Sequence, residues 1–267
     1  MTVRDQMQRL VELPVYPPRR IVSLVPSQTE LLYDLGLDAE VVGITKFCVH
    51  PPHWFRQKPR IGGTKQVKQA VIESLQPDLI LGNKEENDRE QIETLATRYP
   101  VWMSDVHTLS DAAHMMEMIG QLTGRTEAAQ RLVQQIQQTF VQWPKPQPLR
   151  RAAYFIWRKP WMVAAANTFI HEMLQIAGFV NVFEHRTRYP EIALSELAEA
   201  NPEVVLLSSE PYPFQQKHIA EIKHFCPSAV TQLVDGELFS WYGSRLQYGA
   251  AYFIHLQSRI RLQAPNF

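Results

Sequence analysis

Large aromatic side chains gather in the segments that follow the apolar stretches of this chain, and arginine stands beside several of them. In an open sheet of parallel strands, the loops at the carboxyl ends of the strands border the crevice in which ligands bind. Flat rings contact a bulky, partly apolar ligand at a small cost in conformational entropy, and guanidinium groups pair with carboxylates or phosphates. An alternative is that many of these rings fill the core instead. We expect a ligand-binding site formed by Phe47, Trp157, Arg158, Trp161, Tyr189, Trp241, Tyr242 and Arg245.

Signatures of catalysis and of nucleotide binding are missing from the sequence. The segment after the first apolar stretch is VPSQTE rather than a GxGxxG fingerprint, and GxxxxGK[ST], GxSxG and HExxH do not occur. The segment IGGTK (61–65) follows a loop rather than a strand, so we interpret it as a turn. We therefore expect a binding protein that is not an enzyme and that has no catalytic residues and no cofactor.

Two histidines and a cysteine lie close together in the segment CVHPPH (48–53). His50 and His53 have the chemistry to share a metal ion, but zinc needs three or four ligands and no further cluster lies nearby in sequence. We favour a proline-stiffened loop, and no metal site is expected. The only two cysteines, Cys48 and Cys226, do not form a zinc framework, and the sequence leaves a disulfide between them open.

The elements that must position the aromatic residues alternate between strand and helix, which is typical of a parallel sheet covered on both sides. The first helix is expected to begin with Ser27 as its cap, to carry a capping box completed by Glu30, and to end at Gly36. Strands are predicted at 21–25, 41–45, 78–82, 101–103, 152–156, 204–209 and 229–234. Further helices are predicted near 67–75, 87–98, 168–178, 195–200, 216–225 and 244–262.

Residues 110–141 are predicted to be wholly helical, and from Arg125 onward one apolar stripe repeats at the helical period. On either side, IESLQPDLIL (72–81) and LAEANPEVVL (197–206) share a helix end, a proline, an acid and a strand, which favours a duplication. The fold class expected is α/β: two Rossmann-like lobes with parallel sheets, joined by one long rigid helix, with the ligand cleft between the lobes. The predicted domains are 1–109 (N-terminal lobe), 110–142 (connecting helical segment) and 143–267 (C-terminal lobe).

The composition excludes several classes of protein. The chain has 267 residues, of which 45% are hydrophobic, and its 27 basic and 27 acidic residues give no net charge. This argues against disorder and against nucleic acid as a partner, and we expect a monomer. No apolar run reaches the roughly 18 residues of a membrane span. The first twenty residues lack the apolar run of a secretory signal, so either the protein stays inside the cell or its start is trimmed or misassigned.

Three segments, IVSLVPSQTELLYDLG, VVGITKFCVHPP and LQPDLILGNKEEN, carry a resemblance to a known family. The chain resembles the class III solute-binding proteins of ABC importers from about residue 19 to residue 262, and is most similar to the cobalamin-binding and iron-chelate-binding members, the helical-backbone metal receptors. The resemblance implies a ligand held between the lobes by aromatic rings, a periplasmic location and an ABC permease as partner. By position, Phe47, Trp161 and Tyr189 match ligand-contacting aromatic residues of the cobalamin binders.

The chain departs from this family pattern in two places. Near Gly63 and Thr64 the cobalamin binder has a tryptophan, so haem or a ferric siderophore stays open as the ligand beside a corrinoid. Members that dock to a transporter carry a surface glutamate in the first turn of the helix before each Pro-acid-strand segment. Here those positions fall on Ala70 and Ser195, and the nearest carboxylates for docking are Glu73 and Glu196, with Glu199 beside the latter.

We therefore expect a protein that holds a metal chelate (a cobalamin or other corrinoid, haem or a ferric siderophore) for ABC-type import. The alternative is a cytoplasmic enzyme or scavenger that handles a tetrapyrrole or its metal and has no transporter partner. In that alternative, His50, His53 or Cys48 would touch the metal centre.

Overall fold

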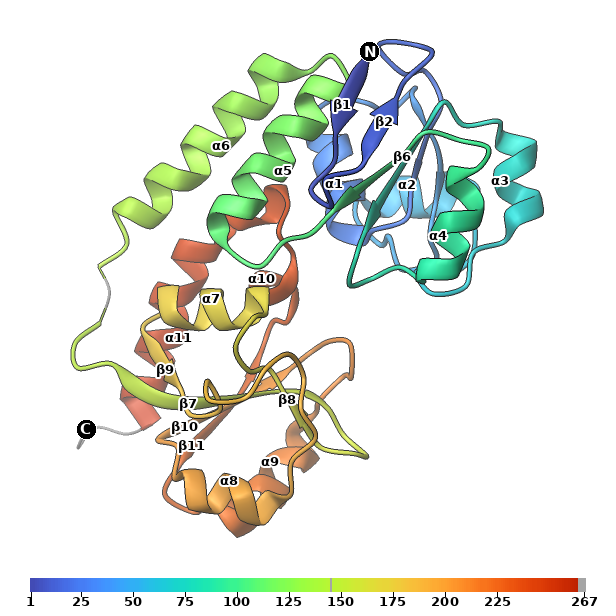
Figure 1. The fold of residues 1–267 in the computed structure, drawn as a ribbon. Coiled ribbons are helices and arrows are strands. Elements are labelled where there is room, and N and C mark those ends of the chain that lie inside the picture. Colours follow the sequence, from blue (N-terminus) through green and yellow to red (C-terminus); the bar gives the residue numbers. More distant parts are fainter. Residues whose placement is uncertain (145, 264–267) are drawn as a thin grey trace. The chain divides into compact units, whose positions relative to one another are not determined.

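The structure, a computed structural model, describes residues 1–144 and 146–263 (Figure 1). The chain divides into two compact units. Unit 1 comprises Met1–Val106, Ser110–Ile136 and Tyr242–Arg245, and unit 2 comprises His107–Leu109, Gln137–Trp241 and Leu246–Phe267. Each unit has its own mainly parallel sheet with helices, so the α/β class expected from the sequence is confirmed.

Unit 1 is built on a sheet of four parallel strands in the order β4-β3-β5-β6. Nearly all of their side chains are buried, which explains why these strands appear in the sequence as continuous apolar runs. The strands are β3 (Ile21–Ser23), β4 (Val41–Ile44), β5 (Leu79–Asn83) and β6 (Val101–Ser104). Six helices accompany or follow these strands in chain order: α1 (Pro26–Asp34), α2 (Pro52–Gln57), α3 (Gln69–Leu75), α4 (Arg89–Ala96), α5 (Leu109–Leu122) and α6 (Thr126–Val141).

Helix α1 begins earlier than the sequence indicated. Pro26 is its first residue and Val25 is the N-cap, which makes no side-chain cap hydrogen bond. Proline is favoured at this position because its φ is already helical and it lacks the N–H that would need a partner. The predicted capping box of Ser27 and Glu30 is therefore wrong. The predicted end is confirmed, since Gly36 has a φ of 73° and its N–H donates to the carbonyl oxygen of Tyr33.

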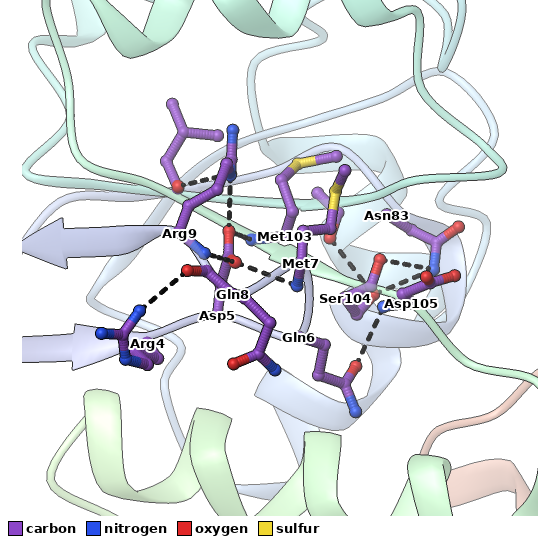
Figure 2. Close-up of polar contacts among 12 residues, drawn as sticks. Arg4, Asp5, Gln6, Met7, Gln8, Arg9, Asn83, Met103, Ser104 and Asp105 are labelled. Atoms are coloured by element: carbon purple, nitrogen blue, oxygen red, sulfur yellow. Dashed lines mark hydrogen bonds and ion pairs between the residues drawn. The ribbon is translucent and has the colours of Figure 1, made fainter.

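A two-stranded antiparallel hairpin, β1 (Thr2–Arg4) and β2 (Leu10–Glu12), precedes the sheet and was absent from the elements expected. Its turn packs against β6, the edge strand of the sheet of unit 1 (Figure 2). The backbone N–H of Gln6 donates to the carbonyl oxygen of Met103 at 3.1 Å, and its side-chain Oε1 accepts from the N–H of Asp105 at 3.0 Å. The hairpin therefore caps backbone groups that an edge strand otherwise leaves exposed.

Asp5 organises the turn of this hairpin from inside (Figure 2). Its Oδ1 accepts from the N–H groups of Met7 and Arg9 at 2.9 and 2.8 Å, and its Oδ2 accepts from the Arg9 Nε at 2.8 Å. The Asp5 side chain is fully buried, so these donors replace the water that a carboxylate would otherwise require.

Residues 110–141 contain two helices. Helix α5 ends at Leu122, Gly124 follows with a φ of 70°, and α6 starts at Thr126. The rod expected from Arg125 onward therefore corresponds to α6, which buries Ala129, Val133 and Ile136 along one face. This one-sided burial confirms the apolar stripe seen in the sequence.

Unit 2 repeats the connection pattern of unit 1. In chain order, each unit places its four parallel strands as second, first, third and fourth across the sheet, and unit 2 adds one short antiparallel strand, β8. The strands are β7 (Arg150–Trp157), β8 (Met162–Val163), β9 (Phe179–Asn181), β10 (Val204–Ser208) and β11 (Val230–Val234). The helices are α7 (Phe169–Ile176), α8 (Leu194–Ala200), α9 (Gln216–Phe225), α10 (Glu237–Ser240) and α11 (Gly249–Gln263), the last preceded by a 3-10 turn (Ser244–Tyr248).

The two repeated sequence segments adopt the same local structure. Helices α3 and α8 each end in a left-handed residue, Gln76 with a φ of 42° and Asn201 with a φ of 43°, and a proline follows each. The left-handed residue ends the helix and the proline prevents its continuation. Both helices therefore stop by the same mechanism, just before a strand of the sheet.

The acids that follow these prolines also have matching partners. Asp78 accepts from the backbone N–H of Arg20 at 2.8 Å, and Glu203 accepts from the backbone N–H of Arg151 at 2.8 Å. In addition, the guanidinium groups of Arg20 and Arg151 each donate, at 2.7 Å, to the carbonyl oxygen of the last residue of α3 and α8 respectively. A shared set of side-chain bonds at equivalent places supports the duplication hypothesis.

Candidate functional site

Phe47 lies in the segment that follows β4, on the carboxyl side of the sheet of unit 1. Its side chain is 50% exposed, and the Lys46 ammonium lies 5.0 Å from the ring centroid. A Cβ atom at Gly63 would lie 3.3 Å from Phe47 Cε2 and 3.5 Å from Lys46 Cε. The side chains of Phe47 and Lys46 therefore lie next to Gly63, and a larger side chain at residue 63 would compete with them for the same space.

A buried polar layer supports the loop that follows β5. Asn83 Oδ1 accepts from the N–H groups of Glu85 and Glu86 at 2.8 and 3.1 Å. Asn83 Nδ2 donates to Ser104 Oγ at 2.9 Å (Figure 2). Because Asn83 and Ser104 are almost fully buried, these bonds fix the loop backbone. The loop then presents the Glu86 carboxylate, which accepts from the Tyr242 hydroxyl at 2.6 Å.

Tyr242 and Arg245 are packed into unit 1 by a short segment that comes from late in the sequence. Burial, and then the neighbouring Glu86, raises the pKa of the Tyr242 phenol well above its usual value. Arg245 makes two hydrogen bonds to the Glu30 carboxylate, at 2.8 and 2.6 Å. Between them, a Cβ atom at Gly243 would lie 2.5 Å from the Ser27 carbonyl oxygen, so only glycine permits this approach to α1. Both predicted ligand contacts thus bind carboxylates of the chain itself.

In unit 2 the predicted residue Trp157 ends β7, and Arg158 and Trp161 follow it, with Arg158 next to the Trp161 ring. Trp157 is 39% exposed. Arg158 makes two hydrogen bonds to the Glu221 carboxylate at 2.9 and 3.0 Å, and its guanidinium carbon lies 5.5 Å from the Trp161 ring centroid. The stacked cation and ring stabilise this loop, and the ion pair already neutralises the arginine.

Sequence reasoning missed three residues of the same aromatic group: Tyr212, Phe214 and His218. Phe214 stacks on Trp161 with centroids 6.0 Å apart, and the Tyr212 ring meets the Trp157 ring edge-on at 5.7 Å. Tyr212 also lies 5.5 Å from the His218 ring. Their signal was present in the segment EPYPFQQKH, which places aromatic residues directly after the strand predicted at 204–209.

The remaining predicted contacts of unit 2 differ in burial. Tyr189 is half-buried, with the Arg188 guanidinium carbon 6.0 Å from its ring centroid. Trp241 is buried, and its Nε1–H donates to Glu210 Oε1 at 2.8 Å. Ser240 Oγ donates to the same carboxylate oxygen at 2.7 Å. Among the predicted aromatic residues, Phe47 and Trp157 therefore present the largest exposed fractions in the described part of the chain.

The stability of unit 2 should depend on pH through Glu210. Burial raises the pKa of the Glu210 carboxyl; the donors Ser240 and Trp241 oppose this rise, and the acids Glu237 and Asp235 add to it. At pH values between the ordinary and the raised pKa, the Glu210 carboxyl is protonated more often in the folded state than in the unfolded state. The stabilisation from this group is therefore full below the ordinary pKa and falls as pH rises, by at most about 1.4 kcal/mol per pH unit.

The variant Glu210→Gln cannot titrate at this position and should lose that part of the slope. Its free energy of unfolding relative to wild type is expected to increase as the pH rises above the ordinary pKa of a glutamate, about 4.3. Denaturant titrations at a series of pH values measure this difference, and Glu12→Gln, at an exposed glutamate, controls for removal of one carboxylate. A difference between Glu210→Gln and wild type that stays constant with pH would contradict the prediction.

The two glutamates predicted for transporter docking each have a basic partner. Glu73, near the end of α3, is paired with Arg98. Glu196, in the first turn of α8, is paired with Arg186 and accepts from the backbone N–H of Ala193 at 2.7 Å. These contacts lower the pKa of Glu196, the backbone N–H contributing most.

The segment around Cys48 shows no arrangement suited to holding a metal. Cys48 is fully buried, its Sγ lies 3.1 Å from Thr29 Oγ1 and from Thr45 Oγ1, and burial raises the pKa of its thiol to about 11. Cys48 and Cys226 are both free and buried, so no disulfide joins them. Over the described residues, no group of three or more His, Cys, Asp or Glu side chains is arranged to hold a metal ion.

Within that same part of the chain, no helix combines the length and hydrophobicity that crossing a bilayer requires.

Comparison with known proteins identifies the family to which the chain is similar. A family model described as "Periplasmic binding protein" matches residues 21–225. The vitamin B12-binding protein of Vibrio cholerae is 26% identical over 199 residues, which cover 72% of this chain and 71% of that protein.

Two solved structures share the fold. The crystal structure of the periplasmic vitamin B12-binding protein of Vibrio cholerae matches with a TM-score of 0.77 at 21% identity, covering 92% of this chain and 98% of the other. The periplasmic heme-binding protein of Roseiflexus sp. RS-1 in its apo form matches with a TM-score of 0.77 at 20% identity, covering 91% and 99%. At these identities the matches establish the architecture of the chain, while the ligand has to be argued from its own residues.

Proposed function

Because the chain belongs to the periplasmic binding protein family, we propose that it is a solute-binding protein that captures a metal chelate for an ABC importer. The candidate chelates are a cobalamin or other corrinoid, haem and a ferric siderophore. Relatives whose names state vitamin B12 or heme binding support the first two. The chemistry is recognition alone, in which no bond is made or broken.

The observation that carries this proposal is the position of two exposed rings. Phe47 follows β4 in unit 1 and Trp157 ends β7 in unit 2, so each lies at the carboxyl side of a parallel sheet. These side chains are 50% and 39% exposed, although burial would stabilise rings of their size by about 1.5–3 kcal/mol. A flat, partly apolar chelate provides the surface that such rings would cover.

The proposed setting is the periplasm, with an ABC permease as partner. Glu73 and Glu196 are the proposed docking carboxylates, since surface charges steer and orient a partner. A chelate scavenger without a transporter is a second candidate, favoured by one observation: Ala70 and Ser195 are exposed in the first turns of α3 and α8, where docking members carry glutamate. Fractionation of the native protein between periplasm and cytoplasm separates the two candidates.

A direct test soaks the purified protein with haemin, cyanocobalamin or ferric desferrioxamine B and records its absorption spectrum after gel filtration. We expect one of these chromophores to be retained with the protein. A ligand present at 100 times its Kd should also stabilise the fold by about 2.7 kcal/mol, measured as a shift in Tm. No retained band and no thermal shift with any of the three would refute the proposal.

Variants at the two exposed rings test where the chelate binds. Phe47→Ala and Trp157→Ala are each expected to weaken binding about tenfold, measured by titration of the absorption band. Phe225→Ala is the matched control, since Phe225 is 41% exposed at the end of α9, on the amino side of the sheet of unit 2. Equal affinities of all three variants and wild type would place the chelate elsewhere.

A further inference from the structure

The side chain of His218 has a fixed pattern of hydrogen bonding. It lies in the first turn of α9, only 2% exposed, and its Nδ1 accepts from the backbone N–H of Gln215 at 2.9 Å. A neutral imidazole carries one proton, so an Nδ1 that accepts leaves the proton on Nε2. Burial, and then the nearby Arg158, lowers the pKa of His218, which favours this neutral form.

This tautomer determines the role of the Tyr212 hydroxyl. His218 Nε2 lies 3.3 Å from that oxygen, and because Nε2 carries the proton, the hydroxyl is the acceptor. Tyr212 therefore keeps its own hydroxyl proton for a third group.

The surroundings of Tyr212 indicate what that third group would be. The ring of Tyr212 is only half-buried, and it meets the exposed ring of Trp157 edge-on. Trp157 is the last residue of β7 and Tyr212 follows β10, so both lie at the carboxyl side of the sheet of unit 2, where the proposed function puts the chelate. A flat ligand on Trp157 would bring its rim toward Tyr212.

We propose that the Tyr212 hydroxyl donates a hydrogen bond to an oxygen atom at the rim of the bound chelate, and that His218 is the positioning residue that holds it as a donor. This assignment rests on the proposed function. It specifies the ligand class further, as a chelate whose rim carries carboxylate, amide or hydroxamate oxygens.

The first test is Tyr212→Phe, which removes the donor and keeps the ring. For whichever of haemin, cyanocobalamin and ferric desferrioxamine B the wild type binds, we expect about three- to tenfold weaker binding. Thermal unfolding of the variant without ligand shows that the fold is retained. If wild type binds a probe and Tyr212→Phe binds it equally well, this assignment is overturned while the proposed function stands. If wild type binds none of them, the proposed function fails and this assignment with it.

Two substitutions at His218 separate positioning from a merely structural role. The amide nitrogen of glutamine replaces Nε2, so His218→Gln should retain the bond to Tyr212 and bind within about twofold of wild type. The amide oxygen of asparagine replaces Nδ1, so His218→Asn should keep the bond from Gln215 but bind as weakly as Tyr212→Phe. If the affinities instead follow the thermal stabilities of the two variants, His218 serves the fold only and the positioning role is overturned.

Discussion

Replacing Arg245 with methionine is expected to destabilise unit 1 by about 2–4 kcal/mol. The side chains of Arg245 and Glu30 are only 15% and 14% exposed, so the variant leaves a carboxylate in a mostly dry position without its cation. Burial already raises the pKa of Glu30 despite the opposing contribution of Arg245, and loss of the arginine removes that opposition. Denaturant titration measures the change in the free energy of unfolding.

Two controls isolate the cause of this loss. The double variant Glu30→Met with Arg245→Met removes both charges, and it should recover most of the stability, because an apolar pair often matches a buried ion pair. Arg89→Met breaks an exposed pair with Glu93, whose side chains are 89% and 59% exposed, and should cost less than about 0.5 kcal/mol. Equal losses in Arg245→Met and Arg89→Met would contradict the importance assigned to burial.

The second large effect is expected at Asp5. Asp5→Ala removes the acceptor for three backbone N–H groups, those of Met7, Arg9 and Met103, and for the Arg9 side chain, and should destabilise unit 1 by about 2–4 kcal/mol. The turn then no longer holds Gln6 against β6, so the amide of Asp105, which donates to Gln6, should exchange faster with solvent. Denaturant titration and hydrogen exchange of residues 103–105 measure the two consequences.

Arg4→Ala is the control for the Asp5 variant. Arg4 lies in the same hairpin, and its guanidinium donates to the Gln8 carbonyl oxygen at an exposed position, so its loss should cost less than about 0.5 kcal/mol. If Asp5→Ala were as stable as Arg4→Ala, the hairpin would not depend on its buried carboxylate.

The regular part of the fold could be predicted because its signals are local. Continuous apolar runs located the main strands within about two residues, and Gly36 marked a helix end. The hairpin at the N-terminus could not be found this way. Its strands have three residues each, and its turn places Gln8 at a φ of 65° without glycine or asparagine. What stabilises it is Asp5 and the edge of β6, and neither is visible in the local sequence.

The local position of the aromatic residues relative to the strands was predictable, but their burial was not. Sequence position put aromatic residues at or after the ends of strands, as for Trp157 and Phe47, yet burial depends on partners far away in the chain. Tyr242 is buried by a contact with Glu86 at a separation of 156 residues, and Arg245 meets Glu30 at a separation of 215. No periodicity reports such pairs. The ligand contacts proposed for Trp157, Arg158, Trp161, Tyr189 and Trp241 in unit 2, and for Phe47, Tyr242 and Arg245 in unit 1, stay predictions.

The matching turns before β5 and β10 allow two similar hydrogen-bonding arrangements to be compared within one protein. Asp78 accepts from two backbone N–H groups, those of Arg19 and Arg20, whereas Glu203 accepts from one, that of Arg151. The same hydrogen-bonding arrangement, from a backbone N–H to an acidic side chain, therefore occurs twice in the chain, with a different number of donors each time. Amide substitutions at the two acids would weigh one extra hydrogen bond under identical solvent, temperature and purity, a calibration that separate proteins cannot provide.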